Sequence, residues 1–409
     1  MAKRLEGKTI LVGLTGGIAC YKAAELVRSL TSAGAQVRVM MSAGAQQFIT
    51  PLTLQTLSGN PVSTDTFDLT QESEIGHIRL ADSADAIVIA PATANLIGKA
   101  AAGIGDDLIT TVLLATRAPV LIAPAMNVHM YENPIVQANI SRLRAHGMRI
   151  VEPGEGFLAC GYAGKGRLAE TAVIHAEVER AVTPQDLNGE RVLVTAGPNR
   201  EAIDPVRFIS NRSTGKMGFA VAAAAWRRGA ETTLIASPTD LATPHGVRRR
   251  DVTTAEEMRG AVVEQFEQTS ILLMAAAVAD YRPAKVSDQK LKKTAGPMTL
   301  ELTRTVDVLG EIAPRKSKQI VIGFAAETEN VLANAERKLA EKNLDLIVAN
   351  DVAGTDTGFA VDTNAVTIIG RDGKRHQVPL MQKEDVADRI LDAVIEVRQQ
   401  RRNAAARTA

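Results

Sequence analysis

Two adjacent glycines early in the chain are placed where a phosphate group could bind. Gly16 and Gly17 lie in a turn between a β-branched apolar run and a helical pattern, so their backbone N–H groups can approach a phosphate at a helix N-terminus. The next predicted strand, residues 37–41, is followed by Ser42, in the region where a dinucleotide site would carry an acid for a ribose hydroxyl. A mononucleotide with a terminal phosphate, such as FMN, therefore fits better than NAD. The alternative is that the glycines only form a tight turn.

Established phosphate motifs are absent from this region. Gly7-Lys8-Thr9 resembles the end of a P-loop, but the earlier glycine of that motif would fall on Ala2. The run from Gly13 to Gly17 does not have the G-x-G-x-x-G spacing of a dinucleotide fingerprint. The sequence thus excludes the two commonest nucleotide motifs and disfavours a dehydrogenase.

Charged residues in the second half suggest a further site. Asp280 follows an apolar run over residues 271–279, and a carboxylate that ends a buried strand needs a partner. In open parallel sheets that end of the strand faces the ligand. Lys290, Lys292 and Lys293 lie in an aperiodic segment, for which a solvated loop is the simpler interpretation.

Two titratable side chains in the first half have opposite surroundings. Cys160 lies among glycines in a polar segment, which suits a flap that closes over a substrate rather than a buried thiol. Histidine is a common proton-transfer residue, but the residue context of His77 alone is more typical of a structural or surface histidine. Cys20, at the start of a helical pattern, is interpreted as an inert buried thiol.

The elements that position these residues repeat in the two halves. Residues 7–17 and 189–199 each comprise a charged entry, an apolar run and a glycine turn, and each precedes a helical pattern and another strand. Further buried strands are predicted at residues 86–90, 120–123, 271–276, 320–325 and 346–349. This alternation predicts the α/β class, with two doubly wound Rossmann-like domains. A polar, proline-containing segment places the domains at residues 1–183 and 187–409.

Composition excludes several classes of protein. A net charge of +1, from 47 basic and 46 acidic residues, gives no footprint for nucleic acid or an anionic membrane. The longest apolar run falls far short of the ~18 residues of a membrane span, and no signal peptide is evident. With two cysteines there is no disulfide framework. We expect a cytoplasmic protein with a mobile loop at residues 284–297 and a disordered tail from Gln399.

Longer motifs make a specific family resemblance visible. In the first half they are IGHI, PATANL, GDDLIT, PAMNVHMYENP and ACGYAGKGRL, starting at residues 75, 91, 105, 124 and 159. In the second half they are PVRFISNRSTGKMGFA, AAAVADYRP, KLKK, GFAAET and KNLDLIVAND, starting at residues 205, 275, 290, 323 and 342. The first set resembles flavin-dependent cysteine decarboxylases and the second resembles phosphopantothenoylcysteine synthetase. Their order resembles the bacterial bifunctional phosphopantothenate–cysteine ligase and phosphopantothenoylcysteine decarboxylase of coenzyme A synthesis.

For the first half, the resemblance implies FMN-dependent decarboxylation. It implies that FMN oxidises the thiol end of the substrate to provide an electron sink for loss of CO₂. His77 would assist this chemistry, Asn127 would hold the substrate carboxylate, and Cys160 would donate the final proton. One departure is Tyr162, where relatives often carry an acidic residue. The FMN-binding residues are expected to be Gly16, Gly17, Ser42, Thr93, Asn95 and Met126.

For the second half, the resemblance implies that CTP activates 4′-phosphopantothenate as an acyl-cytidylate. The cysteine amine then displaces CMP, and triphosphate chemistry of this kind suits Mg²⁺. Asn211 would act on the acyl-cytidylate, Arg207 would meet a substrate anion, Lys290 would close onto phosphates as a catalytic residue, and Asp280 is a candidate metal ligand. The CTP-binding residues are expected to be Gly197, Ser213, Gly215, Lys216, Asp280, Lys290, Phe324 and Lys342.

Assembly and competing functions follow from the same resemblance. Trimeric contacts of the decarboxylase and dimeric contacts of the ligase imply a homo-oligomer, with a dodecamer as the combined form. One alternative is a protein with a single active half, such as a decarboxylase with a regulatory nucleotide domain. Another is a non-catalytic flavin-binding partner protein, but that class predicts loss of Cys160 or Asn127, and both are present.

Overall fold

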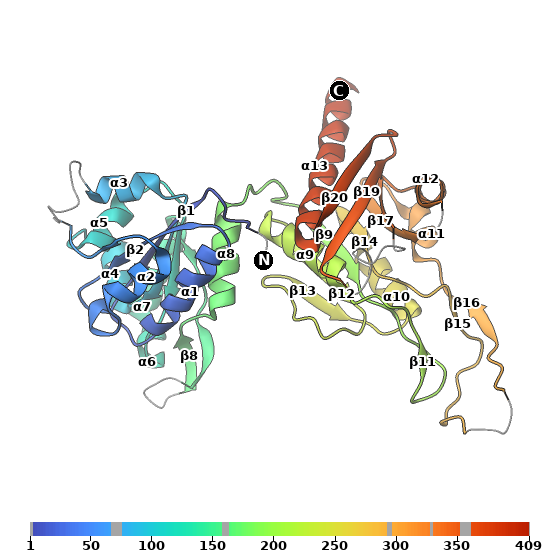
Figure 1. Ribbon diagram of the computed structural model, residues 1–409, viewed down its shortest axis with the longest axis horizontal. Coiled ribbons are helices and arrows are strands. Elements are labelled where there is room, and N and C mark those ends of the chain that lie inside the picture. The colour runs from blue at the N-terminus through green and yellow to red at the C-terminus, as the bar shows by residue number, and fades with distance from the viewer. Residues whose placement is uncertain are drawn as a thin grey trace. The chain divides into compact units, whose positions relative to one another are not determined.

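The computed structural model describes residues 3–66, 76–157, 163–292, 297–327, 330–351 and 361–408. The chain divides into two compact units, residues 1–183 and 184–409. Each has its own sheet and its own hydrophobic core (Figure 1). None of the helices in the described ranges is long and apolar enough to cross a membrane.

Unit 1 is built on a six-stranded parallel sheet in the order β3-β2-β1-β4-β5-β6. Its strands are β1 (Thr9–Leu14), β2 (Gln36–Met41), β3 (Val62–Ser63), β4 (Ala86–Ala92), β5 (Val120–Pro124) and β6 (Arg149–Ile150). The strand order reverses between β1 and β4, which makes the gap between their carboxyl ends the ligand position of a doubly wound sheet.

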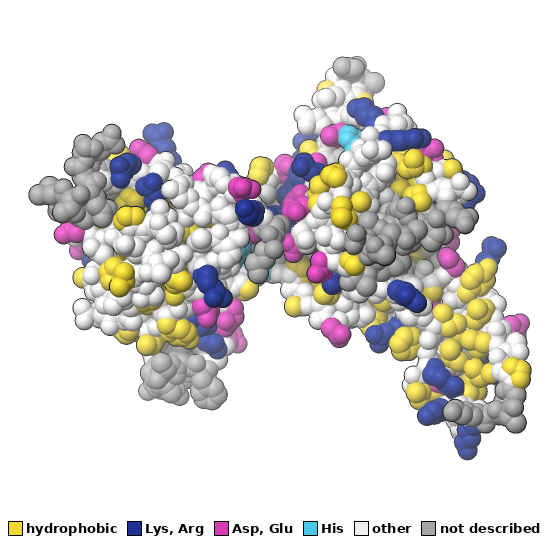
Figure 2. Space-filling view, in the orientation of Figure 1, with side chains coloured by type: hydrophobic (Ala, Val, Ile, Leu, Met, Phe, Trp, Pro, Cys, Tyr) yellow, Lys and Arg dark blue, Asp and Glu magenta, His cyan; other side chains and the backbone are white. Residues whose placement is uncertain are grey.

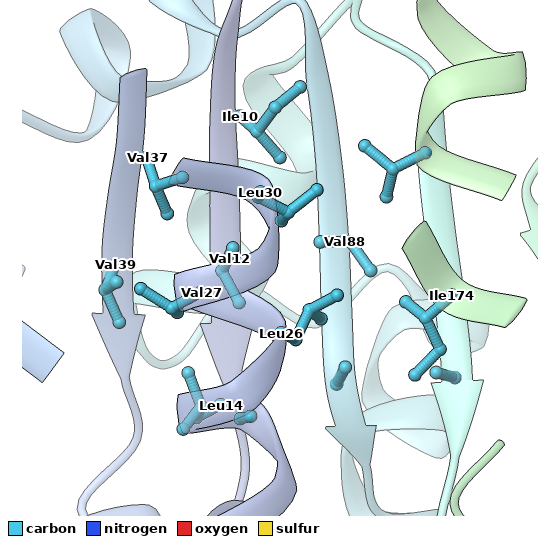
Figure 3. Close-up of a cluster of buried hydrophobic side chains, with 14 of the residues drawn as sticks. Ile10, Val12, Leu14, Leu26, Val27, Leu30, Val37, Val39, Val88 and Ile174 are labelled. Atoms are coloured by element: carbon cyan, nitrogen blue, oxygen red, sulfur yellow. The ribbon is translucent and has the colours of Figure 1, made fainter. Parts of the chain in front are cut away.

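Helices cover both faces of this sheet. The helices are α1 (Cys20–Ser32), α2 (Pro51–Ser58), α3 (Gly76–Ser83), α4 (Ala94–Ala102), α5 (Leu108–Ala115), α6 (Val128–Tyr131), α7 (Pro134–Ala145) and α8 (Thr171–Val182), with a 3₁₀ turn η1 (Ala45–Gln47). On one face, alternate β1 residues Ile10, Val12 and Leu14 pack against α1 and α8 (Figure 3). On the other face, Leu11 and Ile89 pack with α4, α5 and α7. A hairpin, β7 (Gly154–Phe157) and β8 (Ala163–Arg167), follows the sheet.

Unit 2 repeats the strand order and then extends it. Its sheet has the order β13-β12-β9-β14-β17-β18-β19-β20, and the last two strands are antiparallel. The strands are β9 (Arg191–Ala196), β12 (Glu231–Ala236), β13 (Arg248–Asp251), β14 (Ile271–Met274), β17 (Ile320–Glu327), β18 (Leu346–Asp351), β19 (Thr363–Gly370) and β20 (Arg375–Gln382). The prediction of two doubly wound α/β domains is therefore confirmed, whereas the β19–β20 hairpin was not predicted.

Helices also cover both faces of the second sheet. They are α9 (Lys216–Arg227), α10 (Ala255–Phe266), α11 (Val308–Ile312), α12 (Val331–Glu341) and α13 (Lys383–Thr408), with a 3₁₀ turn η2 (Ala313–Arg315). Helices α10, α11 and α12 share one core, and α9 is joined to α13 by ion pairs from Arg227 to Asp388 and from Arg228 to Asp392. Two small ribbons project from the unit: β10 (Glu201–Ala202) with β11 (Phe208–Ile209), and β15 (Tyr281–Pro283) with β16 (Leu302–Arg304) (Figure 1).

The expected disorder of the tail is wrong. Helix α13 continues without a break to Thr408. The tail consists largely of Ala, Arg and Gln, which favour helix, and it contains no Gly or Pro. Arg398 donates to the carbonyl of Asp186 at 2.6 Å, and Arg401 pairs with Asp345, so tertiary contacts fix the helix as well.

One strand is shorter than predicted. Strand β14 ends at Met274, two residues before the expected end. The N–H of Ala276 donates to the hydroxyl of Thr195 at 3.1 Å instead of continuing the strand ladder. The chain therefore leaves the sheet before Ala277 and opens the gap that a ligand could enter.

Candidate active sites

Two loops of unit 1 approach each other closely at the glycine turn. Gly16 follows β1 and Gly44 follows β2, and a Cβ atom added to Gly16 would lie 3.0 Å from the backbone of Gly44. Ser42, at the end of β2, accepts a hydrogen bond on Oγ from the N–H of Ala45 at 3.2 Å. By contrast, a Cβ on Gly17 would meet nothing closer than 4.0 Å. Gly16 is therefore required for packing of the turn, and Gly17 borders open space.

Thr15 joins the two loops at the point where the strand order reverses. Its hydroxyl donates to the carbonyl of Pro91 at 2.7 Å and accepts from the N–H of Thr93 at 2.9 Å. Thr93 caps α4 by accepting from Leu96, and Asn95 is exposed in the first turn of that helix. The structure thus brings the loop after β1 to the loop that carries Thr93. Sequence reasoning missed Thr15, whose only signal was its position before the glycines.

The β7–β8 hairpin is anchored against the segment that carries Asn127. The N–H of Met126 donates to the carbonyl of Gly166 at 2.9 Å. A Cβ on Gly166 would lie 2.4 Å from the Met126 carbonyl oxygen, and its φ is +146°. A Cβ on Gly164, at φ +151°, would lie 2.7 Å from the side chain of Val128. These glycines serve close packing at positive φ, rather than only flexibility.

Of the residues predicted to bind substrate or transfer protons in unit 1, the structure describes Asn127 and His77 but not Cys160. Asn127 caps α6, where its Oδ1 accepts from the N–H of His129 at 2.9 Å. His77 is the second residue of α3, and within the described residues its buried Nδ1 has no hydrogen-bond partner. Cys160 and Tyr162 lie outside the described residues. Burial raises the pKa of the Cys20 thiol, whose Sγ lies 3.3 Å from the Thr15 carbonyl oxygen.

Unit 2 contains a cavity of about 880 Å³ at the carboxyl ends of β14 and β17. The predicted residues that line it are Asn211, Ser213, Gly215, Lys216, Asp280, Phe324 and Lys342. Residues that sequence reasoning missed also line it: Asp307, Lys338, Asn350, Asn364 and Lys383. The cavity therefore collects lysines from three helices, α9, α12 and α13, together with the segment just after α12.

Asn211 holds the entrance to α9 in place. Its Nδ2 donates to the Ala277 carbonyl at 2.6 Å, and its Oδ1 accepts from the N–H of Ser213 at 2.9 Å. Gly215 begins α9 at φ +81°, and a Cβ there would lie 3.3 Å from Gly197. Gly197 therefore packs behind the turn and is not among the cavity-lining residues. The backbone N–H groups at the start of α9 are oriented for an anion.

Electrostatics differ between parts of this cavity. Lys342 pairs with Asp307, and Lys338 donates to the carbonyl of Phe324 at 3.0 Å. Burial alone would raise the pKa of Asp307, but the hydrogen bonds from Lys342 and from the N–H of Gly310 lower it overall. Asp307 is therefore ionised at neutral pH and offsets part of the lysine charge.

Two predicted residues lie elsewhere in unit 2. The guanidinium of Arg207 is bound to the buried carboxylate of Asp204 and to the carbonyl of Leu291 at 2.8 Å. Arg207 lowers the pKa of Asp204, aided by backbone N–H donors. Lys290 is exposed next to this pair, and neither Lys290 nor Arg207 lines the cavity. Asp280 does line it, but the described residues contain no cluster of three His, Cys, Asp or Glu side chains that could hold a metal ion.

Each of the two units matches a family of known proteins. The profile of the Flavoprotein family matches residues 2–183, and that of the DNA/pantothenate metabolism flavoprotein C-terminal domain matches residues 187–397. The chain is 51% identical over 394 residues to the coenzyme A biosynthesis bifunctional protein CoaBC of Bacillus subtilis, covering 95% of this chain and 97% of that protein.

Two solved structures illustrate the separate units. A crystal structure of the C-terminal domain of a coenzyme A biosynthesis bifunctional protein CoaBC is 42% identical, with a TM-score of 0.46, and covers 53% of this chain and 99% of that chain. The FMN-dependent cysteine decarboxylase SpaF is 32% identical, with a TM-score of 0.39, and covers 44% of this chain and 99% of that chain.

Proposed function

Because the chain belongs to the family of coenzyme A biosynthesis bifunctional proteins, we propose that it ligates 4′-phosphopantothenate to L-cysteine with CTP and decarboxylates the product to 4′-phosphopantetheine. The observation that carries this proposal is the presence of both family profiles on one chain, each over a unit with a site at the same edge of its sheet. We assign decarboxylation to unit 1 and ligation to unit 2.

The cavity of unit 2 suits activation of a carboxylate by a nucleoside triphosphate. An oxygen of the 4′-phosphopantothenate carboxylate attacks the α-phosphorus of CTP, pyrophosphate leaves, and the cysteine amine then displaces CMP from the acyl carbon. The cationic Lys216, Lys338 and Lys342, with the N–H groups at the start of α9, offset the charge of the triphosphate. We propose that Asn211 contacts the acyl-cytidylate, because it lines the cavity and joins Ala277, after β14, to Ser213, before α9. Mg²⁺ bound through Asp280 would complete the charge balance.

Residues outside the cavity are assigned to closure. Lys290 is exposed. The next residue, Leu291, donates its N–H to Asp204 and accepts a hydrogen bond from Arg207 on its carbonyl oxygen. We propose that the segment around Leu291 moves toward the cavity together with Arg207. Lys290 then reaches the phosphates, and Arg207 reaches the substrate anion.

The turn of unit 1 suits FMN. Gly16 and Gly44 approach so closely that a single added Cβ would fill the space between them, and Ser42 lies at the same strand end. We propose that FMN is held by Gly16, Gly17, Ser42, Thr93, Asn95 and Met126. Bound FMN supplies the oxidation that creates an electron sink for decarboxylation.

The chain's own residues would bind the substrate and move protons. The amide of Asn127 binds the substrate carboxylate, and its position is fixed by its bond to His129 and by the hairpin behind Gly166. His77 assists the oxidation and decarboxylation, and the thiol of Cys160 donates the proton that completes the product.

We infer contacts between copies of the chain from two groups of exposed apolar side chains. In unit 1, Ile18, Tyr21, Phe48 and Leu52 are exposed on segments next to the glycine turn. In unit 2 a patch covers the projecting ribbons (Figure 2). It comprises Val206, Phe208, Tyr281, Val286, Met298 and Leu302. We propose trimeric contacts through the first group, dimeric contacts through the second, and a dodecamer that combines them, acting in the cytoplasm.

A product assay on the full chain tests the function. Protein loaded with FMN is incubated with 4′-phosphopantothenate, L-cysteine, CTP and Mg²⁺, and the products are resolved by mass spectrometry. CTP-dependent 4′-phosphopantetheine is expected. Accumulation of the carboxylated adduct alone would contradict the role of unit 1, and absence of any CTP-dependent product would contradict the bifunctional assignment.

A further inference from the structure

One part of the unit 2 cavity is formed by residues that the chemistry above does not use. Lys383, the first residue of α13, and Asn364, on β19, both line the cavity together with Lys216. Lys383 is only 5% exposed, and its Nζ donates to the carbonyl of Val361 at 2.6 Å. The antiparallel strands β19 and β20 therefore place the buried side chain of Lys383 in the cavity.

Positive charge is concentrated around Lys383. The charged groups that act on it from the described residues are Lys216, at the N-terminus of α9, and Asp362, before β19. Asp362 acts on both lysines, because its Oδ1 also lies 2.6 Å from Nζ of Lys216. Burial first, and then the charge of Lys216, lower the pKa of Lys383 to about 8. Two ammonium groups and a helix N-terminus thus face one exposed carboxylate, an arrangement that favours an additional anion.

Asn364 provides independent evidence for a ligand. Its side chain lines the cavity and is 3% exposed, yet Oδ1 has no hydrogen-bond donor among the described residues. A buried amide oxygen without a donor carries a desolvation penalty, which a ligand N–H or O–H would remove.

We propose that Lys383, Lys216 and the N-terminus of α9 bind a phosphoryl group of a substrate, and that Asn364 accepts a hydrogen bond from the same ligand. The proposal extends the proposed function, because CTP and 4′-phosphopantothenate both carry phosphoryl groups and both have hydroxyl or N–H donors. Lys383 acts as an ammonium, and it would be a substrate-binding residue that holds the phosphoryl group.

Binding should then be linked to protonation of Lys383. Below about pH 8 the amine already carries its proton, so the ligand meets two cations. Above that pH the free protein has lost this charge, and a phosphoryl anion raises the pKa again, so binding takes up a proton. Affinity should fall by up to about tenfold for each further pH unit until the pKa of the complex is reached.

Calorimetric titration of the full-length protein tests this linkage. CTP and 4′-phosphopantothenate are titrated separately at about pH 7 and about pH 9, in two buffers that differ in ionisation enthalpy, which reveals proton uptake. Cytidine and pantothenate are the unphosphorylated comparisons. The variants are Lys383→Met and Lys383→Arg. Lys374→Met is the matched control, because Lys374 lies in the turn of the β19–β20 hairpin that precedes α13 and its side chain is 61% exposed.

Proton uptake near pH 9 is expected for a phosphorylated ligand and not for its unphosphorylated counterpart. The ligand that shows it identifies the source of the phosphoryl group. Lys383→Met should weaken that ligand roughly 10- to 100-fold near pH 7, as expected for loss of a charged hydrogen bond. Lys383→Arg should retain the affinity but lose the pH break, because arginine stays protonated. Lys374→Met should match the unmodified protein.

Three results would overturn the subsite. They are absence of proton uptake with both phosphorylated ligands, uptake that persists in Lys383→Arg, and affinity that rises with pH, as for an amine that acts as a base. Failure of the proposed function is recognised separately, because the unmodified protein would then give no CTP-dependent product. An unfolded Lys383→Met leaves the first two tests intact, since they use the unmodified protein and the arginine variant.

Discussion

The two units share the same order for their first six strands and place their sites at the same edge of the sheet, but the sites differ in charge. The turn of unit 1 is made of backbone and neutral side chains such as Thr15 and Ser42. The cavity of unit 2 is lined by Lys216, Lys338, Lys342 and Lys383 among the described residues. One fold thus presents a neutral turn in unit 1, where we propose that FMN binds, and a cationic cavity in unit 2, where we propose that CTP binds. The loops, and not the sheet, determine the chemistry.

The largest effects should come from the asparagine that we assign to the substrate in each unit. Asn211→Ala removes the link between Ala277 and Ser213 and the group assigned to the acyl-cytidylate, so ligation should fall by about 100-fold or more. Asn127→Ala should reduce decarboxylation to a similar extent. Each variant serves as the control for the other, with ligation followed by CMP release and decarboxylation measured on supplied 4′-phosphopantothenoylcysteine. Loss of both activities in either variant would contradict two separate sites.

A smaller effect is expected from the glycines that anchor the hairpin of unit 1. Gly166→Ala would place a methyl group 2.4 Å from the Met126 carbonyl at φ +146°, which should destabilise unit 1 by about 1–3 kcal/mol and lower the decarboxylation rate. Gly154→Ala is the matched control, because its Cβ would lie 3.9 Å from the nearest atom. Thermal unfolding and decarboxylase kcat measure the two effects. Equal behaviour of the variants would show that the hairpin base tolerates displacement.

The smallest effect should be that of ionic strength. Raising the salt concentration from roughly 50 to 500 mM screens the lysines of unit 2, so KM for CTP should rise several-fold. Retention of FMN by unit 1 should change less than about twofold, because its turn binds through backbone dipoles at short range. Flavin fluorescence and initial rates of CMP release provide the measurements. Equal salt dependence at both sites would remove the electrostatic distinction between the units.

The sequence contained much of the fold because the buried strands are short apolar runs followed by glycine turns. Strands β4 and β5 begin at the predicted residues and end within two residues of the predicted ends, and the doubly wound class is confirmed. The short strands β3 and β6 were missed, because two residues are too few to show a period. The expected disorder of the tail is wrong because its Ala, Arg and Gln residues favour helix and because Arg401 pairs with Asp345.

The site was less predictable where it depends on distant segments. Ser213, Gly215 and Lys216 lie within four residues at the start of a helical pattern, so their shared position could be inferred. Lys383 is separated from Lys216 by most of unit 2 and reaches the cavity only because β19 and β20 join the sheet beyond β18. Arg207 shows the converse: a cation near the motif is bound to Asp204, three residues away, and this pairing is decided by burial.

The position of α13 has a consequence for the order in which the protein is made. This helix lies more than 150 residues after α9 in the sequence, yet its first residue lines the cavity and its ion pairs with Arg227 and Arg228 fix α9, which begins there. Domains generally fold as units while the chain is synthesised, the N-terminal one first. Unit 1 can therefore fold while the ribosome is still translating unit 2. The cavity of unit 2 can be completed only after translation has passed Asp392.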